Sequence, residues 1–567
     1  MALESEIGLV GRDGITALVE SLVERRHKQP LPVIVAFGPG GSGKTSLLDH
    51  VRRRYRDAPT AKVDLDRAGS RSCKDILDVA AEQLRSCQHA EFGRMRLPRY
   101  DLARLALYNE PADDPHHRAR ELAAKQMTRL VAVADAAEVV EMLPPAQGLG
   151  KVLRPLLLRL IGLAVIAPRS LRWLLGGPRV ASALRWFENY VGHELKSGQR
   201  LKFDAALVHT WSLNRSGDTL EIDRLLVAAF LADITAAYRF RGCYRRMNSL
   251  LLLDGADLLD GIDSYLPPQR PRPAARATDF LSLVAERRVK EPHVPLLVIA
   301  TKQSAPSLPD SAPSVFLPVR LEPFTLAQTR QFLAEWNRTR NSTVESEALV
   351  EELQEVTHGH PLAVRLAIQL VQFVFARDQV LPSVRAVFDE RLPVDETTTF
   401  QDAMVGDYLL LRFFQRIPGA EEMPEREAAR EIFARLAAPR LLDRHVIRAL
   451  LPSTWSAENM RALLAQLSFV SQQGDNFVLH PLLRDLLARR LREVPEDQPF
   501  SHRNVHRLLN DRYDSLGQRE DALYHALALG EVHLVAHRLR PHVDERSDRW
   551  IAELAAIAEA PMPPGEG

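Results

Sequence analysis

The sequence is poor in cysteine and lacks long uninterrupted apolar runs. Its 567 residues include three cysteines, Cys73, Cys87 and Cys243. They are too few and too scattered for a disulfide framework, and no pair has the spacing of zinc ligands. No run of 18 uncharged apolar residues occurs, and residues 1–11 lack the apolar centre of a signal peptide. These absences argue against secreted and membrane-spanning proteins and favour a cytoplasmic location.

The sequence also lacks an excess of positive or negative charge. The chain has 74 Lys and Arg against 73 Asp and Glu, a formal charge of +1. Such a chain is not held on nucleic acid by its overall charge. Hydrophobic residues make up 46% and charged residues 26%, as in ordinary globular proteins. The length predicts several domains rather than one core.

Short apolar runs that alternate with helical patterns predict a parallel sheet with helices on both faces. The expected strands are 33–37, 61–66, 249–253, 295–300 and 315–321. Helices are expected at 44–54 and 73–84. Because one crossover helix cannot use the long interval between the second and third strands, we interpret residues 88–218 as a helical insertion.

The insertion is expected to contain helices at 98–108, 116–140, 151–167 and 170–195. Its most apolar stretch is 151–177, but the uninterrupted core of that stretch covers only 160–167. A helix of this length spans about 12 Å, far short of a bilayer. A buried helix pair, contact with a membrane surface and a partner surface remain alternatives for this stretch.

Helical patterns dominate after the last strand. Helices at 326–336 and 346–356 are followed by three more at 426–437, 440–450 and 456–467. Gly474 and Asp475 then separate two short apolar segments within 469–480, which predicts a hairpin. Three helices and a hairpin form a winged-helix pattern. The tail at 501–560 consists of short helical segments broken at Gly517 and Gly530, like the start of a helical-repeat array.

One motif carries specific chemistry. Residues 38–45 read Gly-Pro-Gly-Gly-Ser-Gly-Lys-Thr, a complete G-x-x-x-x-G-K-[ST] sequence between a strand and a helix. Its glycines let backbone N–H groups surround phosphate oxygens at the positive end of the helix. Lys44 is expected to reach the β- and γ-phosphates, and the Thr45 hydroxyl to ligate Mg²⁺. The motif predicts nucleotide binding.

Two further strand ends fit this site. Leu250–Leu253 lead into Asp254, which is expected to hold the Mg²⁺ shell beside the P-loop. Asp257 and Asp260 follow, either as functional acids or as a solvated helix start. Gly255 stands where a fast ATPase has a glutamate base, which favours slow turnover or a substitute role for Asp257. Thr301 or Lys302 is a candidate γ-phosphate sensor or a simple strand terminus.

The order of motifs resembles the STAND class of P-loop ATPases, which includes the NACHT and NB-ARC proteins. The matching segments are Gly11-Arg12, the P-loop, Asp254-Gly-Ala-Asp257, Thr301-Lys302, 321–325, Gly359-His-Pro361-Leu and 477–485. The match covers 8–66, 220–490 and loosely the tail, but not the insertion. Leu258 replaces a common second acid, and Lys302 a common Arg.

The resemblance implies roles for individual residues. Val10, Gly11 and Arg12 would lie against adenine and ribose, and Pro361 would pack on adenine from a helical lid. Pro361 is equally suited to the first position of a helix. His480 would reach the β-phosphate of ADP and lock a closed state, or would be an ordinary hairpin-edge histidine.

The sequence therefore predicts an α/β P-loop NTPase core with a helical insert, helical lid, winged-helix domain and helical tail. The expected domains are 1–87 and 219–321 for the core, 88–218 for the insert, 322–400 for the lid, 401–495 for the winged helix and 496–567 for the tail. The candidate catalytic residues are Lys44, Asp254 and Asp257. The candidate nucleotide-binding residues are Gly11, Arg12, Gly38, Gly40, Gly41, Ser42, Gly43, Lys44, Thr45, Ser46, Thr301, Pro361 and His480. The candidate Mg²⁺ ligands are Thr45 and Asp254.

The best-supported function is an ATP/ADP-binding signalling switch that is closed with ADP and assembles with ATP, with slow or no hydrolysis. Its expected partners are nucleotide, further copies of itself and an unidentified protein. An AAA+-like DNA-associated or remodelling ATPase and a membrane-associated effector acting through the insert are alternatives. The predicted third helix, 456–467, carries a single Arg, Arg461, which is a poor footprint for DNA.

Overall fold

The computed structural model describes residues 9–24, 29–65, 72–87, 95–108, 177–193, 203–240, 246–259, 280–304, 313–340, 347–378, 380–388, 404–414, 423–453, 455–540 and 548–561. The predicted helices at 116–140 and 151–167 lie outside the described residues. So do Asp260 and all but the last residue of the apolar stretch 151–177, for which membrane contact is an alternative. No helix within the described ranges is long and apolar enough to cross a membrane.

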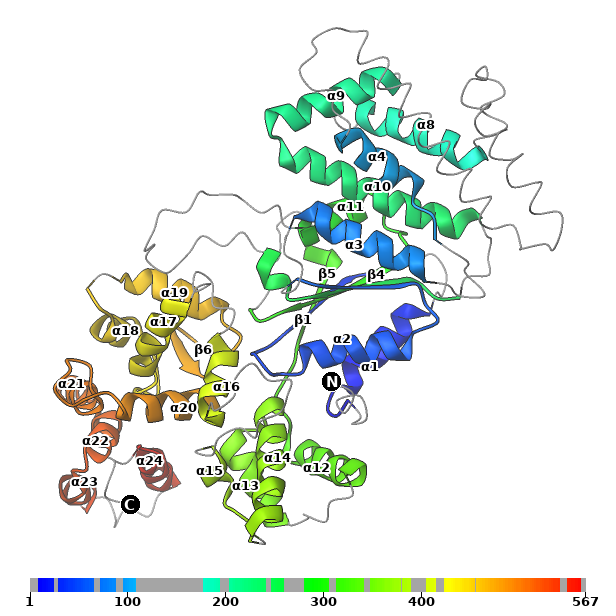
Figure 1. Cartoon of the computed structure of the whole chain (residues 1–567). Coiled ribbons are helices and arrows are strands. Elements are labelled where there is room, and N and C mark those ends of the chain that lie inside the picture. The colour runs from blue at the N-terminus through cyan, green and yellow to red at the C-terminus, as the bar shows by residue number, and fades with distance from the viewer. Residues whose placement is uncertain are drawn as a thin grey trace.

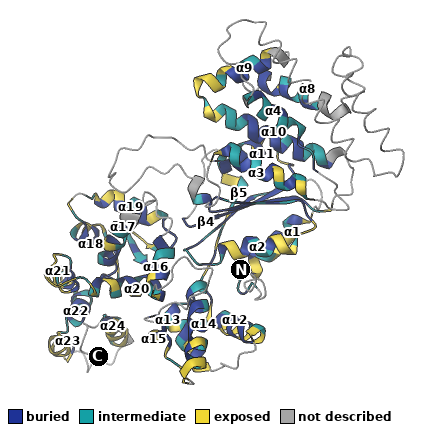
Figure 2. Cartoon of the chain, viewed as in Figure 1, coloured by how far each residue is buried: buried dark blue, intermediate teal, exposed yellow. Residues whose placement is uncertain are grey.

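A five-stranded parallel sheet lies at the centre of the molecule, in the order β2-β3-β4-β1-β5 (Figure 1). The strands are β1 (Val33–Phe37), β2 (Thr60–Asp64), β3 (Ser249–Asp254), β4 (Leu296–Lys302) and β5 (Phe316–Arg320). All five predicted strands are confirmed. Every residue of β3 and β4 is buried, because these continuous apolar strands are covered on both faces (Figure 2).

Helices cover the two faces of the sheet separately (Figure 1). Helices α1 (Asp13–Val23) and α2 (Lys44–Arg54) pack on one face. The other face carries α3 (Cys73–Ser86), α10 (Thr219–Phe240) and α11 (Phe280–Lys290). This arrangement places the N-terminus of α2 at the carboxyl edge of the sheet, where α/β proteins bind ligands.

The described part of the insertion is helical, as expected. It consists of α4 (Pro98–Tyr108), α8 (Gly177–His193) and α9 (Phe203–Ser216). These helices share one buried cluster with α3, α10 and the sheet. Within the described residues the insertion is therefore a further helical layer on the core rather than a separate body.

After β5 the chain forms two helical units. The lid contains α12 (Leu326–Arg340), α13 (Glu347–Thr357), α14 (Pro361–Asp378) and α15 (Val384–Val387). We call residues 404–492 the hairpin unit. Its elements are α16 (Val405–Phe414), α17 (Met423–Leu436), α18 (Arg444–Leu450), α19 (Ala457–Gln466), β6 (Val470–Gln473), β7 (Asn476–Leu479) and α20 (Pro481–Arg492). One buried cluster joins the lid, the hairpin unit and the first tail helix.

The hairpin unit has the predicted three helices, and β6 pairs antiparallel with β7 across Gly474 and Asp475. One predicted boundary is wrong, because α18 begins at Arg444 rather than at residue 440. The Asp443 side chain caps this helix by accepting the N–H groups of His445 and Val446 at 2.7 Å. Arg440 instead pairs with Glu520 and Asp521 of the tail.

The tail consists of four described helices. They are α21 (His502–Ser515), α22 (Arg519–Ala528), α23 (Val532–Leu539) and α24 (Asp548–Ala558). Gly517 and Gly530 lie between successive helices, as the sequence predicts. Both have a positive φ. The tail contacts the hairpin unit through α21 and through the ion pairs of Arg440.

Candidate nucleotide-binding site

The P-loop connects β1 to α2 at the carboxyl edge of the sheet. Gly41 and Gly43 have φ of 84° and 92°, a left-handed conformation that suits glycine. Lys44 is buried, and its Nζ donates to the carbonyl oxygens of Gly38 at 2.6 Å and Pro39 at 2.7 Å. The ammonium group is thus held within the loop, while Thr45 and Ser46 are exposed at the start of α2.

The outer side of the loop is held by residues far away in sequence. The Gly40 oxygen lies 2.9 Å from His360 Nε2, and the Gly41 oxygen accepts the Leu362 N–H at 3.2 Å. The Ser42 oxygen accepts from Arg12 Nη2 at 2.9 Å. His360 and Leu362 were not among the predicted site residues, although they flank the predicted Pro361. The sequence signal that could have indicated them is a histidine directly before a proline that starts a helix.

The protonation of His360 follows from its own hydrogen bonds. The residue precedes α14, and its Nδ1 accepts the Ala363 N–H at 3.3 Å, as a helix-capping group does. The ring proton is therefore assigned to Nε2, which donates to Gly40. Burial, with a further contribution from His480, lowers the pKa of His360 to about 3. The ring is neutral at neutral pH.

Arg12 links the N-terminal segment to the P-loop and to the exit of β5. Besides Ser42, its guanidinium donates to the carbonyls of Gly11 and Glu322, and it lies 5.7 Å above the Phe324 ring. Burial lowers the pKa of Arg12. The expected contact of Gly11 and Arg12 with adenine and ribose stays a prediction, since the guanidinium is engaged with protein carbonyls.

The end of β3 and the end of β4 are joined by side chains. Thr301 Oγ1 donates to Asp254 Oδ1 at 2.7 Å and accepts the Gly255 N–H at 3.1 Å. Both side chains are buried. Thr301 thereby orients the carboxylate that is predicted to hold Mg²⁺. Its predicted role as a γ-phosphate sensor remains a prediction.

Asp257 lies in the short 3₁₀ helix η3 (Ala256–Leu259) and faces the residues after β4. Its carboxylate accepts the Gln303 N–H at 2.7 Å. It also accepts both the N–H and the hydroxyl of Ser304 at 3.0 Å. These bonds give Asp257 a structural task at this edge. Its predicted catalytic role stays a prediction.

The hairpin unit reaches the same edge. A Cβ added at Gly40 would lie 2.0 Å from the Arg412 oxygen at the end of α16. Gln303 Nε2 donates to the Phe413 oxygen at 2.6 Å, and Ser304 forms an isolated antiparallel bridge with Leu467. The P-loop and the end of β4 are thus covered by the hairpin unit as well as by the lid.

His480 lies between these units. Its ring centroid is 6.0 Å from those of both His360 and Phe413. Its buried Nδ1 has no hydrogen-bond partner among the described residues. Burial, with the charges of His358 and Arg320, lowers the pKa of His480 to about 4. His480 is therefore a neutral ring in contact with the residue that holds Gly40, and its bond to a β-phosphate stays a prediction.

Pro361 is the first residue of α14, directly after His360. This position confirms that it starts a helix beside the P-loop, while its predicted packing on adenine stays a prediction. A second contact near this point joins the lid to α20, because His358 Nε2 lies 3.2 Å from Asp485 Oδ2.

The predicted Mg²⁺ ligands fit the chemistry of that ion. No group of three or more His, Cys, Asp or Glu residues in the described ranges forms a metal site by itself. Mg²⁺ in nucleotide sites takes one or two protein oxygens and the phosphates. The oriented Asp254 carboxylate and the exposed Thr45 hydroxyl are oxygen donors of this kind.

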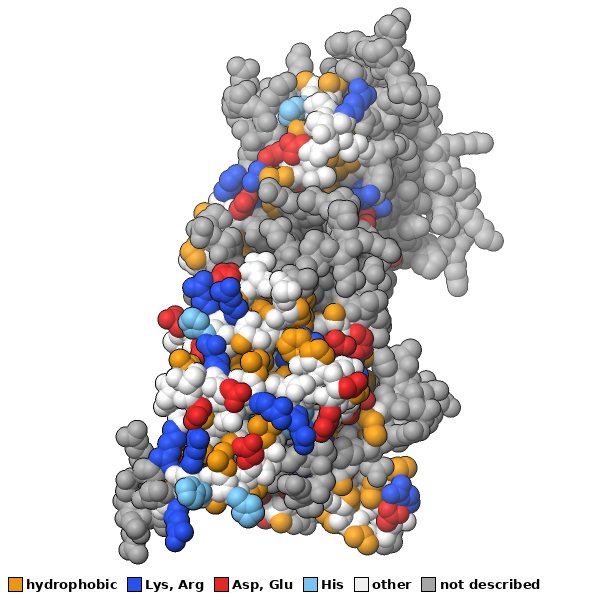
Figure 3. Space-filling model, turned by 90° about the vertical axis from the view of Figure 1, so that its left-hand side faces the viewer, with side chains coloured by type: hydrophobic (Ala, Val, Ile, Leu, Met, Phe, Trp, Pro, Cys, Tyr) orange, Lys and Arg blue, Asp and Glu red, His pale blue; other side chains and the backbone are white. Residues whose placement is uncertain are grey.

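Helix α19 of the hairpin unit has a single basic side chain. In α19 the single arginine, Arg461, donates to the Asp475 oxygen at 3.1 Å and lies 5.3 Å from the Phe477 ring. On the side of the molecule that Figure 3 shows, basic and acidic side chains lie interspersed, with apolar ones between them. A helix with one engaged arginine differs from the basic recognition helix of a DNA-binding protein.

Comparison with known proteins gives only distant structural similarity. No family model and no curated protein matches the chain. It is similar to a Walker-type ATPase of Pyrococcus abyssi, with 12% identity, TM-score 0.41, and coverage of 84% of this chain and 96% of that one.

It is also similar to a signal transduction ATPase with numerous domains (STAND) from Pyrococcus horikoshii that has a tetratricopeptide repeat sensor. Identity is 11% and the TM-score 0.25. The match covers 97% of this chain and 52% of that one, so this chain spans about half the length of the Pyrococcus horikoshii protein. At these scores the likeness carries no argument about the site. The P-loop NTPase core is identified by its own sheet order, by the glycine loop between β1 and α2, and by Asp254 at the end of β3.

Proposed function

We propose that the chain is a STAND-type signalling switch that binds ATP and ADP with Mg²⁺. With ADP bound the chain stays closed, and with ATP bound it assembles with further copies of itself. Hydrolysis is slow or absent, because Gly255 follows Asp254 where a glutamate base would stand. The observation that carries the proposal is that the lid and the hairpin unit both contact the P-loop itself.

Each group has a defined task in this function. The P-loop amides and Lys44 bind phosphate, and Thr45 and Asp254 would hold Mg²⁺, which neutralises phosphate charge when bound. Pro361 and His480 connect the nucleotide to the lid and the hairpin unit. A ligand shifts such an equilibrium only by its difference in affinity for the two states. ADP would favour the closed contacts, and the γ-phosphate would oppose them.

The first experiment is to purify the chain, identify the nucleotide that accompanies it, and measure its mass in ADP and in ATP with Mg²⁺. We expect bound ADP, a monomer in ADP and an assembly in ATP. Lys44→Ala should lose the nucleotide and the response, and His480→Ala should assemble more readily than the wild type. An empty protein with rapid constitutive ATP turnover, unaffected by His480→Ala, would contradict the switch and favour a remodelling ATPase.

A further inference from the structure

Hydrogen bonds from residues outside the P-loop fix the orientation of three consecutive peptide groups in the loop. The carbonyls of Gly40, Gly41 and Ser42 accept from His360 Nε2, from the Leu362 N–H and from Arg12 respectively. Two of the three donors, His360 and Leu362, lie at the start of the lid, His360 directly before helix α14 and Leu362 within it. The lid is therefore bonded to the phosphate-binding loop itself.

These bonds determine where the loop amides point. In a planar trans peptide the N–H lies opposite the carbonyl oxygen. With the Gly40 and Ser42 carbonyls held outward, the N–H groups of Gly41 and Gly43 are turned to the inner side of the loop. The middle N–H, that of Ser42, closes a turn on Pro39 at 3.1 Å. Inward-pointing amides are what an anion-binding loop uses.

We propose that His360 is a positioning residue through which closure of the lid shapes the phosphate-binding loop, so that lid closure and phosphate affinity are coupled. This inference rests on the proposed function and adds a route by which nucleotide and lid influence each other. Since coupling is reciprocal, bound phosphate also holds the lid closed, independently of any contact with adenine.

Packing around His360 supports this coupling. The His360 side chain is 1% exposed and its ring lies 5.0 Å from that of Phe413. A Cβ at Gly41 would lie 2.8 Å from His360 Cε1 and 2.7 Å from Leu362 Cβ. The glycine thus gives the lid room to approach the loop backbone. The neutral ring has one N–H group, at Nε2, and the Gly40 carbonyl accepts its hydrogen bond.

The test measures binding of Mg-pyrophosphate and Mg-ADP to the full chain by calorimetry, for wild type, His360→Leu and His360→Gln. Pyrophosphate is the informative probe, because it engages the loop and has no adenine to contact the lid. Leucine removes the donor, whereas glutamine carries an N–H at a similar reach. His506→Leu is the matched control, since it removes a buried hydrogen-bonded histidine remote from the loop.

We expect His360→Leu to weaken pyrophosphate and ADP by the same factor, about tenfold. His360→Gln should recover most of this loss, and His506→Leu should change neither affinity. The proposal is overturned if His360→Leu leaves pyrophosphate binding unchanged, if it weakens ADP much more than pyrophosphate, or if glutamine fails to rescue. A wild type that binds neither ligand would instead refute the proposed function.

Hydrogen exchange on the wild type provides a test that needs no variant. Pyrophosphate should slow exchange of the Leu362 and Ala363 amides, which lie on the lid and are bonded to Gly41 and His360. If the wild type binds pyrophosphate and these amides exchange at an unchanged rate, the lid and the loop are not coupled.

Discussion

At the scale of single residues, the glycines of the P-loop serve two sides of the loop. Sequence reasoning explains them by the inner side, where phosphate would approach the backbone. The structure adds the outer side, where Gly40 meets the end of α16 and Gly41 meets the lid. The φ of Gly40 is not in the positive region, so its lack of a side chain is required by this contact rather than by backbone conformation.

We therefore predict that Gly40→Ala loosens the closed form. The added methyl would lie 2.0 Å from the Arg412 oxygen, and overpacking of this kind costs roughly 1–3 kcal/mol. α16 should move off the loop, which amide exchange at Arg412–Phe414 and the rate of ADP release would both report as increases.

Gly43→Ala is the contrasting variant. Gly43 has a φ of 92° and no atom within 4 Å of an added Cβ, so alanine there strains the backbone at the head of α2. It should weaken nucleotide binding, while exchange in α16 of the nucleotide-free protein stays unchanged. If Gly40→Ala also leaves α16 unchanged, the contact between the hairpin unit and the loop is absent in solution.

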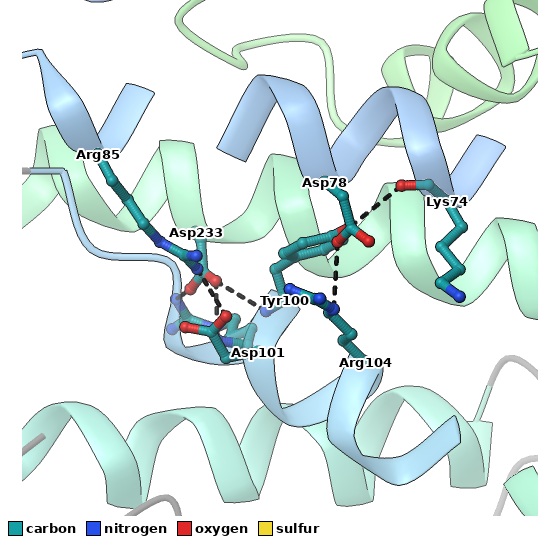
Figure 4. Close-up of polar contacts among 8 residues, drawn as sticks. Lys74, Asp78, Arg85, Tyr100, Asp101, Arg104 and Asp233 are labelled. Atoms are coloured by element: carbon teal, nitrogen blue, oxygen red, sulfur yellow. Dashed lines mark hydrogen bonds and ion pairs between the residues drawn. The ribbon is translucent and has the colours of Figure 1, made fainter. Parts of the chain in front are cut away.

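At the scale of elements, the buried carboxylate of Asp233 joins the insertion to the core. Asp233 of α10 accepts the N–H group of Tyr100 at 2.9 Å (Figure 4). It also accepts the N–H group of Arg99 at 2.7 Å and pairs with the Arg99 guanidinium at 2.9 Å. These N–H groups belong to the first turn of α4, and the first N–H groups of a helix have no carbonyl acceptor within the helix. A residue 134 positions away in sequence thus caps the helix.

Asp233→Ala should destabilise the protein by roughly 2–4 kcal/mol, because it removes the carboxylate that pairs with Arg99 and uncaps α4. Asp101→Ala is the control on the same helix. Asp101 pairs with Arg85, and their side chains are 41% and 34% exposed respectively. Such exposed ion pairs contribute about 0–1 kcal/mol to the free energy of unfolding. Urea unfolding of both variants measures the difference. Equal effects would mean that Asp233 does not hold α4.

These elements show what the sequence predicts and what it does not. Short apolar runs predicted the strands, although β2 alternates with polar residues, and the glycine motif predicted the loop. Both signals are local. The start of α18 was misplaced since Arg440, a good helix former, pairs with the tail, and the Asp443 cap lies inside the periodic pattern. Asp233 and His360 act on residues more than 100 positions away, which no local pattern reveals.

At the scale of the whole molecule, buried or half-buried histidines with lowered pKa values lie where parts of the chain meet. His360 and His480 lie between lid, P-loop and hairpin unit, with pKa values lowered to about 3 and about 4, mainly by burial. His506 and His525 form a buried pair between α21 and α22, with Nδ1 atoms 2.9 Å apart. Burial also lowers the pKa of His525 to about 3. Packing thus keeps each ring neutral at an acidic pH where an exposed imidazole would be protonated.

We predict that acid favours opening of the closed form. In an opened molecule His360 and His480 regain a pKa near 6.5, so the open state binds more protons than the closed state. The free energy of opening therefore falls as pH drops below about 6.5, and keeps falling until the closed-state pKa values of about 4 for His480 and about 3 for His360 are reached. At one unit below 6.5, each histidine contributes up to about 1.4 kcal/mol, or together up to about a hundredfold in the opening equilibrium.

The rate of ADP release at pH 7.5 and pH 5.5 measures this effect, and it should rise in acid for the wild type. The ADP phosphate itself titrates near pH 6, so the comparison that matters is with a His360→Gln/His480→Gln double variant. That variant retains side-chain N–H donors but has no imidazole to protonate. Its release rate should therefore respond to pH by the phosphate contribution alone. A double variant with the same acid response as the wild type would place the proton-binding groups elsewhere, and the histidines at this junction would then have no part in the pH dependence of opening.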